Sequence, residues 1–352
     1  MKFSFRKPNK EKILIYQESF LKYYLKDNKT EILPSINKKI YLHFVFISLL
    51  KNPLLILNLK KLRLFYSINF IEYVGPKIII TFLNNDIFFY KLKNYFKGII
   101  FIAIQNGYRF KKDDLFGLNL KKKSLSCDYI FCFGSNVAKK YNHIFNSKII
   151  IHGSTKNNLV KNKSQKKNWC LFISSYGLGG NDNEDLILPM LEEYCNKNNL
   201  VLKILCRLQE QEEINYFNSF KFISNKNIIR NLGNKKFYNS YKILDKSKIS
   251  ISMNATLGYE NLARGGRTLF INVKTRDLNC KSFLSFGWPK KFKNEGKFWL
   301  NSINKKKIFK RLDFLLNSSN SKWNLIHKRY IKQIMNVDKK NKKLNSIIKN
   351  YL

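Results

Sequence analysis

The sequence predicts an α/β protein with two parallel-sheet domains, and three observations support this. The chain has 352 residues, which is too long for one typical domain and suits two of roughly 150 residues each. Short apolar runs of strand type alternate with helical stretches in both halves, as in Rossmann-like domains. A polar, Lys-rich stretch at 157–168 separates the halves, as a linker would.

In the first half, the pattern begins with a strand and then becomes helical. Lys12–Tyr16 (KILIY) is a strand candidate, and Pro34–Val74 is helical and rich in aromatic residues. The alternation then continues with apolar strand runs and the helices between them. In order these are strand Lys77–Phe82, a helix to about Phe96, strand Gly98–Gln105, strand Asp128–Phe133, helix Ser135–Phe145 and strand Lys148–His152.

Two polar clusters end neighbouring strands of this half. Asn84-Asn85-Asp86 follows the first, and Gln105-Asn106-Gly107-Tyr108-Arg109 follows the second. The carboxyl ends of parallel strands meet at one edge of the sheet, so the two clusters should converge on one crevice. We expect Asp86, Gln105, Asn106 and Arg109 to line it, with Asp86 as the candidate catalytic base. The alternative for Asp86 is a helix N-cap.

A third loop, Gly153-Ser154-Thr155-Lys156-Asn157-Asn158, follows the last strand of the first half. It could contact a phosphate or a sugar, or it could begin the interdomain linker. Both interpretations stay open.

The second half repeats the alternation from Trp169 onwards. Its elements are strand Trp169–Ser174, helix Glu184–Asn196, strand Leu200–Cys206, a helix near Glu210–Phe220, a strand near Ile228–Arg230, a helix near Lys235–Leu244, and helices at Ile303–Leu316 and Trp323–Leu352. The aromatic residues of Phe283–Trp299 should pack in the core or between domains.

Two features near the first strands of the second half could meet a diphosphate. The loop at 175–180 is glycine-rich and joins a strand to a helix, so a diphosphate could approach the backbone at Gly179 and Gly180. Arg207 ends the next strand and offers a fixed fork of donors. Its alternative partner is Glu210 in a salt bridge.

Ser247–Val273 is the most informative stretch. Strand Ile249–Met253, a helix over Leu257–Arg264, the Gly265-Gly266 stop and strand Thr268–Val273 form a βαβ unit. Thr256 and Glu260 are four residues apart, so they share a helix face. We expect Thr256 to cap the helix beside phosphates and Glu260 to accept from two ribose hydroxyls, with Asn254 nearby. The alternative is a buried crossover with an exposed Glu.

The same stretch resembles a known superfamily. Ser252-x-Asn254-x-Thr256-x-Gly258-x-Glu260-x-x-Ala263-x-Gly265 looks like the donor segment of GT-B sugar-nucleotide enzymes. The segment LGYENLARGGRTLFIN is similar in sequence to segments of surface-carbohydrate-biosynthesis proteins of that superfamily, and so are ITFLNNDIFFYKL and FIAIQNGYR. The resemblance extends over Ile79–Arg109, Asp128–Asn158 and Ser250–Asn272. It implies that Glu260 binds the ribose and that Arg207 pairs with the donor diphosphate.

The resemblance implies a glycosyltransferase with two Rossmann-like domains facing across a cleft. Residues 1–157 would form the acceptor domain and 169–320 the nucleotide-sugar domain, with helices at 321–352 crossing back. The donor would be a nucleotide-sugar and the acceptor a cell-surface glycan or lipid-linked precursor. No cofactor is expected, and no metal because the sequence has no Asp-x-Asp motif.

Two alternatives remain. A nucleotide-sugar 2-epimerase shares the fold, but it would need carboxylates and His near the sugar, and this chain has only four His. A nucleic-acid-binding protein could account for the net charge of +43. Lysines are used throughout the chain and no nucleic-acid motif is present, so no nucleic acid is expected as a partner.

The six cysteines form no Cys-x-x-Cys pair and the histidines show no zinc spacing, which predicts buried free thiols in a reducing cytoplasm. No signal peptide is expected. The apolar runs Ile40–Leu50 and Pro53–Leu59 are split by Lys51-Asn52 and fall short of the ~20 residues of a transmembrane helix. We expect a cytoplasmic protein, with peripheral contact with an anionic membrane as an option.

Overall fold

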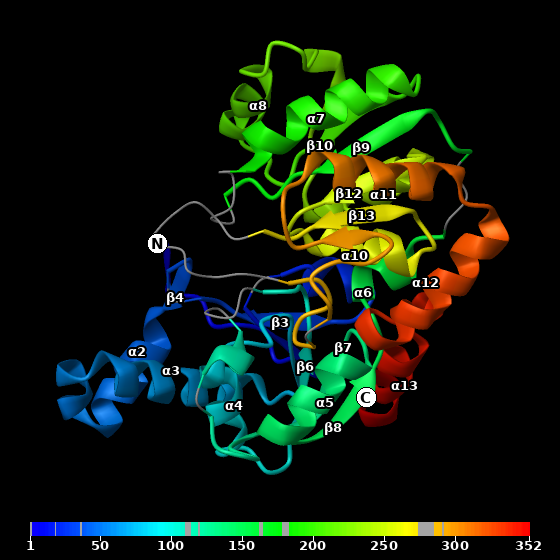
Figure 1. Cartoon of the computed structure of the whole chain (residues 1–352). Helices are drawn as coiled ribbons and strands as arrows, with labels where there is room; N and C mark the ends of the chain where they lie inside the picture. The colour runs from blue at the N-terminus through cyan, green and yellow to red at the C-terminus, as the bar shows by residue number, and fades with distance from the viewer. Residues whose placement is uncertain are drawn as a thin grey trace.

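The structure is a computed structural model that describes residues 2–17, 19–35, 37–109, 114–118, 120–161, 165–177, 183–273, 285–290 and 292–352. It contains two six-stranded sheets, each entirely parallel and flanked by helices (Figure 1). Each sheet comes from one half of the sequence, so the predicted fold class of two Rossmann-like sheets is confirmed.

The first sheet has the strand order β3-β2-β5-β6-β7-β8. Its central strands are apolar on both faces because helices cover both faces of a parallel sheet. The strands are β2 (Ile13–Tyr16), β3 (Thr30–Leu33), β5 (Ile78–Thr81), β6 (Ile100–Ile104), β7 (Leu125–Cys132) and β8 (Phe145–Ile151). A separate two-stranded pair joins β1 (Lys2–Ser4) to β4 (Lys39–Tyr41). The sequence analysis did not predict β1, β3 or β4.

The second sheet has the order β11-β10-β9-β12-β13-β14. Its strands are β9 (Trp169–Ile173), β10 (Val201–Leu205), β11 (Ile228–Ile229), β12 (Ile249–Ser252), β13 (Thr268–Ile271) and β14 (Trp299–Leu300). Phe286 and Trp299 stack with ring centroids 4.5 Å apart. The aromatic residues described in 285–299 therefore belong to the core, as predicted.

Helices connect the strands of both sheets, and their positions follow the predicted alternation. They are α1 (Leu21–Tyr24), α2 (Leu42–Lys51), α3 (Leu59–Val74), α4 (Ile87–Lys93), α5 (Ser135–Ile144), α6 (Thr155–Leu159), α7 (Glu184–Lys197), α8 (Gln211–Asn218), α9 (Tyr238–Lys246), α10 (Thr256–Ala263), α11 (Lys305–Asn317), α12 (Asn320–Ile334) and α13 (Lys342–Tyr351). The short 3₁₀ helices are Pro53–Leu57, Leu115–Gly117, Asn225–Asn227, Asn234–Lys236 and Lys339–Asn341. In the described part of the chain, no helix has the length and apolarity needed to cross a membrane.

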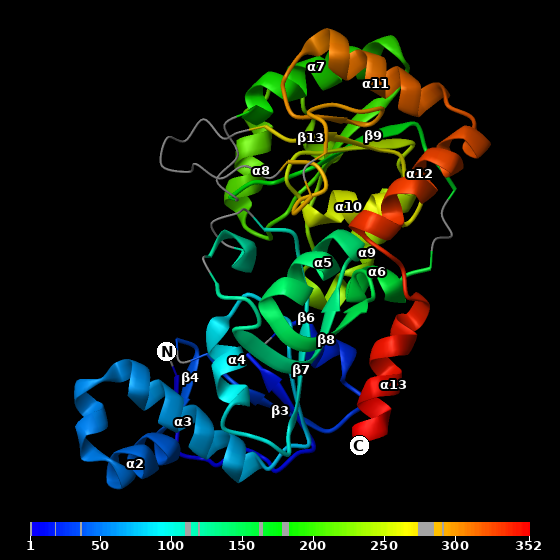
Figure 2. The same ribbon diagram turned by 60° about the horizontal axis from the view of Figure 1, so that its bottom comes forward.

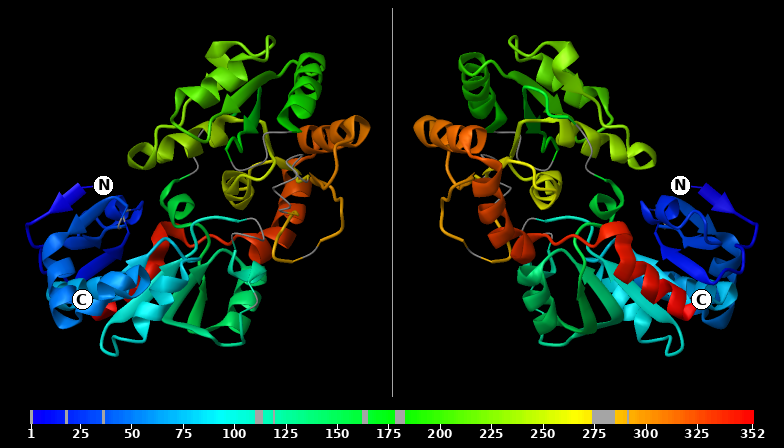
Figure 3. Two further views of the ribbon diagram at one scale, coloured as in Figure 1. Left: turned by 90° about the vertical axis from the view of Figure 1, so that its left-hand side faces the viewer. Right: turned by 90° about the vertical axis from the view of Figure 1, so that its right-hand side faces the viewer.

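The C-terminal segment crosses from the second sheet to the first (Figures 2 and 3). The segment Trp323–Leu352, predicted to be helical, contains two helices in the structure, of which α12 is the first. The helix ends at Ile334, and α13 begins at Lys342 and packs Leu344 and Ile348 against the first sheet. Lys340 and Asn341 between them have φ of 58° and 53°, the left-handed region that interrupts a helix.

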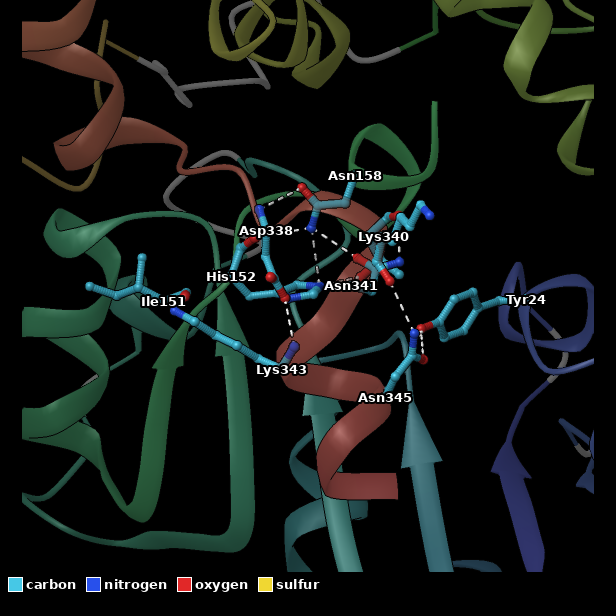
Figure 4. A network of polar contacts seen from close by, with 10 residues as sticks. Tyr24, Ile151, His152, Asn158, Asp338, Lys340, Asn341, Lys343 and Asn345 are labelled. Carbon is cyan, nitrogen blue, oxygen red and sulfur yellow. Dashed lines mark hydrogen bonds and ion pairs between the residues drawn. The ribbon is translucent and has the colours of Figure 1, made fainter. Parts of the chain in front are cut away.

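Buried polar contacts hold this crossing in place (Figure 4). His152 Nδ1 lies 3.1 Å from Asp338 Oδ2, and burial lowers the pKa of His152 to about 4 although Asp338 opposes the shift. Asn158 Nδ2 donates to Asn341 Oδ1 at 2.9 Å, and Asn341 Nδ2 donates to the Thr155 carbonyl at 3.1 Å. We call these five residues the C-terminal clasp.

At its first two residues, the predicted linker 157–168 is not a solvent-exposed connection. Asn157 and Asn158 belong to α6 and are buried. The Asn157 side-chain oxygen accepts from Arg264, and the Asn158 side-chain amide donates to Asn341. Contacts of this kind cross the predicted boundary, so the division into 1–157, 169–320 and 321–352 stays a prediction. The described cysteines, Cys127, Cys132, Cys170, Cys195 and Cys206, are buried and free, as expected; Cys280 lies outside the described residues.

Candidate functional site

Two neighbouring cavities lie between the sheets, at the carboxyl edge of the second sheet, and share lining residues. Their volumes are about 620 and 320 Å³. Loops after β9, β10 and β12 line the smaller cavity from the second half, and Asn106 and Tyr108 line it from the first half. The residues shared by both cavities are Lys156, Arg207, Asn231, Ser240, Leu257 and Glu260. This edge is where an open parallel sheet binds ligands.

The β12–α10 unit places Glu260 at this edge. Gly258 lets α10 approach β12 closely, since a Cβ at that position would overlap the Ser252 side chain. At the far end, Gly265 has φ of 86°, and the amides of Gly265 and Gly266 donate to Leu262 and Asn261 carbonyls. Those two bonds close the helix as a Schellman motif. The helix therefore starts and stops where the sequence predicted, within one residue.

Thr256 does not cap the helix, which corrects the prediction. Ala255 occupies the N-cap position, and no side chain of the described residues caps α10. The Thr256 hydroxyl instead accepts from the Tyr108 amide at 2.9 Å. Sequence spacing could not reveal this contact, because Tyr108 belongs to the other half of the chain. The amides of the first turn of α10 thus keep no side-chain cap, and Thr256 lines the smaller cavity.

Glu260 is a buried carboxylate that lines both cavities. Oε1 accepts a hydrogen bond from the Ser154 hydroxyl, and the Tyr241 hydroxyl also bonds to the carboxylate. Burial raises the pKa of Glu260, while Ser154, Lys156, Tyr241 and Arg264 oppose the shift. The exposed Glu of the alternative interpretation is therefore absent. The carboxylate is fixed in one orientation and faces the cavity.

Arg207 also lines both cavities. Its Nη1 donates to the Tyr176 carbonyl at 2.7 Å, which fixes the guanidinium beside the loop after β9. Burial lowers the pKa of Arg207, with Glu213 and Glu210 opposing the shift. The alternative salt bridge to Glu210 is not among the ion pairs of the described chain, and Arg207 keeps donors available to an anion in the cavity.

Two further polar groups face the same space. Asn254 lines the smaller cavity and is buried, and its Oδ1 has no hydrogen-bond partner in the described part of the chain. A buried polar atom without a partner is rare, and this oxygen can accept a hydrogen bond from a group in the cavity. Lys156 lines both cavities, and its Nζ donates to Asn234 Oδ1 at 2.9 Å. Burial lowers the pKa of Lys156, and Glu260 opposes the shift.

The first-half candidates follow neighbouring strands, as expected, but only Asn106 lines these cavities. Gln105 is buried, and its Oε1 accepts from the Phe133 amide at 2.9 Å. Arg109 donates to Asn84 Oδ1 at 2.9 Å and to Asn106 Oδ1 at 2.5 Å. These bonds order the loop after β6. A contact between Gln105, Arg109 and an acceptor stays a prediction.

Asp86 is the N-cap of α4, the alternative that the sequence left open. Its Oδ1 accepts from the Phe88 amide at 2.9 Å, and its Oδ2 accepts from the Tyr16 hydroxyl at 2.7 Å. Arg63 Nη2 lies 3.7 Å from Oδ2. The side chain remains partly exposed at the strand ends. Its role as a base stays a prediction.

Some predicted site residues lie outside the described part of the chain, and some cavity residues were not predicted. Gly179 and Gly180 lie outside the described residues. Ser154, Lys156 and Tyr241 were not named as site residues, although the Gly153–Asn158 loop was considered for a phosphate or sugar. The position of that loop after β8 was the available signal. In the described residues, no group of three or more His, Cys, Asp or Glu is arranged to hold a metal ion.

Comparisons with known proteins identify the family. The sequence matches a protein family described as "putative O-antigen biosynthesis protein" over residues 102–179 and 181–352. The chain belongs to this family. Among curated proteins, no sequence matches.

Several solved structures are similar in fold. The wall teichoic acid polymerase TagF superposes with a TM-score of 0.53 at 10% identity, covering 97% of this chain and 89% of TagF. The S. aureus MnaA–UDP structure superposes with a TM-score of 0.56 at 12% sequence identity. The match covers 97% of this chain and 96% of MnaA. The UDP-GlcNAc 2-epimerase of Methanocaldococcus jannaschii, in complex with UDP-GlcNAc and UDP, superposes with a TM-score of 0.51 at 12% sequence identity. The match covers 99% of this chain and 100% of the epimerase. These similarities support the GT-B arrangement of the O-antigen family member described here.

Proposed function

We propose that this protein transfers a sugar from a nucleotide-sugar donor to a cell-surface glycan or its lipid-linked precursor, in O-antigen or lipopolysaccharide synthesis. The observation that carries the proposal is the cavity between the sheets. The buried carboxylate of Glu260 and the cations Arg207 and Lys156 line this one cavity. A nucleoside diphosphate offers the complementary groups, two ribose hydroxyls and an anionic diphosphate. The O-antigen family and the structural neighbours solved with UDP are consistent with this ligand.

In the proposed reaction, the acceptor hydroxyl attacks the anomeric carbon of the donor sugar. The bond from that carbon to the diphosphate oxygen breaks, and the nucleoside diphosphate leaves as an anion. Arg207, Lys156 and the uncapped amides of α10 would stabilise the leaving charge. A base takes the acceptor proton, and Asp86 is the candidate. The proposal includes no metal and no cofactor beyond the donor.

The alternative on the same fold is nucleotide-sugar 2-epimerisation. Two cavity features favour transfer. Of the described residues that line the two cavities, none is a histidine, and the only carboxylates are Glu210 and Glu260. An epimerase must move a proton at the sugar and would need further acid–base groups there. A lipid-linked acceptor would lie at a membrane, so the proposal also includes peripheral contact with an anionic membrane.

Thermal unfolding with a panel of nucleotides and nucleotide sugars tests the proposal. A ligand that binds only the folded state stabilises it by about 2.7 kcal/mol at a hundred times Kd. We expect one nucleoside diphosphate and its sugar conjugates to raise the Tm, and the matching nucleoside to raise it less. Acceptor-dependent release of the diphosphate then identifies a transferase. Isomerisation of the donor without acceptor would contradict transfer, and a panel without any shift would contradict the donor site.

A further inference from the structure

A helical hairpin projects from the first sheet, away from the second sheet (Figures 1 and 2). It consists of α2, the 3₁₀ helix Pro53–Leu57 and the first half of α3. Its inner side packs against the second half of α3. The Phe44 and Phe70 rings lie 5.2 Å apart, and Asn69 Nδ2 donates to Ser48 Oγ at 2.8 Å. Lys51 Nζ donates to Asn69 Oδ1 at 2.8 Å, which ties the end of α2 to α3. These contacts hold α2 against α3, so the hairpin is an ordered element with a defined outer surface.

The outer surface of the hairpin exposes several large apolar side chains beside polar ones such as Asn52 and Asn58. Six large side chains, 59–83% exposed, occupy its end, and we call them the apolar tip: Phe46, Leu50, Leu54, Ile56, Leu57 and Leu59. Leu55, between them in sequence, is buried. Single exposed apolar residues are ordinary, but six on one short element form the kind of patch that marks an interaction site.

The sequence around the apolar tip contains basic residues and no acidic ones. No Asp or Glu occurs between Glu31 and Glu72, while this stretch contains Lys38, Lys39, Lys51, Lys60, Lys61 and Arg63. Lys51, Lys60 and Lys61 immediately flank the tip and are exposed. Lysines with long apolar stems beside an apolar surface are suited to an anionic interface, where the stem is buried and the ammonium remains at the charged layer.

We propose that the apolar tip docks on the surface of an anionic lipid bilayer. Two arguments favour lipid over a second copy of the chain or another protein. The residues of the tip are mainly aliphatic, whereas protein interfaces are enriched in Tyr, Trp and Arg. Two copies meeting tip to tip would also bring like-charged lysines together.

Docking at this place would serve the transfer reaction, and this part of the inference rests on the proposed function. The second half of α3 packs on the first sheet, and Arg63 joins the hairpin to the strand ends. Its guanidinium lies 4.1 Å from the centre of the Phe88 ring and 3.7 Å from Asp86. A tip inserted in the bilayer would therefore hold the acceptor half, and its candidate base, beside a membrane that contains the lipid-linked acceptor.

Vesicle co-sedimentation of the full-length protein tests the proposal. The probes are vesicles of phosphatidylcholine alone and of phosphatidylcholine with phosphatidylglycerol. The triple variant Leu54→Gln/Ile56→Gln/Leu57→Gln changes only exposed side chains, and the control Leu325→Gln changes an equally exposed leucine on α12. We expect binding to anionic vesicles, weakened at least about tenfold in the triple variant and unchanged in the control.

The charge is tested separately. Lys60→Glu/Lys61→Glu should weaken binding to anionic vesicles by roughly fivefold or more per lysine, and high salt should do the same. The control Lys306→Glu/Lys310→Glu carries the same charge change on α11 and should bind as the parent does. Equal binding of parent and triple variant, or equal binding to neutral and anionic vesicles, would overturn the proposal. So would an oligomer that the triple variant converts to monomer while vesicle binding persists.

Nucleotide-induced thermal shifts, measured on the same proteins, keep the two proposals apart. Loss of vesicle binding in the triple variant, with its nucleotide shift intact, supports docking and shows that the variant is folded. A parent that binds nucleotide but no vesicles contradicts docking and the proposed membrane contact, and leaves the donor site supported. A parent that binds vesicles but no nucleotide contradicts the proposed function and leaves docking supported.

Discussion

At the scale of single residues, buried carboxylates mark the ligand edge of the second sheet. Glu213 is fully buried and accepts from the Arg207 and Leu208 amides at 2.9 and 2.6 Å, so it fixes the loop after β10. Glu260 is buried beside Ser154 and faces the cavity. Glu184 is buried with its Oε2 unpaired within the described chain. Buried carboxyl groups of this kind are expected where a ligand or its loops must be positioned.

Glu184 should make the stability of the protein depend on pH. Burial raises its pKa from 4.5 to about 8. The folded state thus binds this proton more tightly, and the stability it contributes is present below pH 4.5 and lost as pH rises through about 8. Between pH 6 and 9 the parent should lose roughly 3 kcal/mol of unfolding free energy through this group, and Glu184→Gln should not. Urea unfolding at each pH measures this.

The control for this prediction is Glu212→Gln, which removes the same charge from an exposed position on α8. It should retain the pH dependence of the parent. A Glu184→Gln variant that loses stability with pH as steeply as the parent would show that Glu184 is ionised in the folded protein throughout this range.

At the scale of elements, most strands of the two sheets and the helices between them could be predicted, because apolar runs and glycine stops act locally, whereas β1, β3 and β4 could not. Ile249–Met253 and Thr268–Val273 coincide with β12 and β13 to within two residues. Long-range contacts could not be predicted in this way. Thr256 bonds to Tyr108 from the other half, and Asn157 and Asn158 are buried by segments distant in sequence. Such polar residues look like cap or linker residues until the partner is known.

Gly258 tests why α10 can lie against β12. Gly258→Ala would place a methyl group on the Ser252 side chain and should cost about 1–3 kcal/mol of unfolding free energy, because the helix must move. Gly98→Ala is the matched control, since nothing lies within 4 Å of its Cβ position. It should be neutral or stabilise the protein by up to about 1 kcal/mol. Chemical denaturation compares them, and equal stabilities would refute the close approach.

At the scale of the whole molecule, the two halves are joined by contacts that could not be predicted from the sequence. The Tyr108 and Tyr259 rings lie 4.4 Å apart across the interface. The C-terminal clasp fastens α13 to the first sheet after the chain has completed the second. The site between the sheets therefore depends on both halves. Two parallel sheets followed from local patterns, whereas their relative placement depends on these contacts between distant segments.

The clasp should contribute measurably to stability. Asn341→Gly keeps a residue that tolerates the left-handed backbone but removes the side-chain bonds to Asn158 and Thr155. It should cost about 2 kcal/mol, since buried partners are left unpaired. Lys340→Gly has the same backbone conformation and an exposed side chain, so it should be neutral or slightly stabilising. Thermal unfolding of both variants decides; equal Tm values would contradict a structural role for the Asn341 amide.

The central claim is that a donor nucleotide binds between the sheets, with Glu260 on its ribose. Calorimetric titration of the nucleoside diphosphate into Glu260→Gln tests it most directly, with Glu212→Gln as a control of the same chemistry outside the cavity. Hydrogen bonds to a charged acceptor contribute about 1.5–3 kcal/mol, so affinity should fall roughly ten- to a hundredfold in Glu260→Gln and stay unchanged in the control. A Glu260→Gln protein that melts normally and binds the nucleotide as tightly as the parent would contradict the claim.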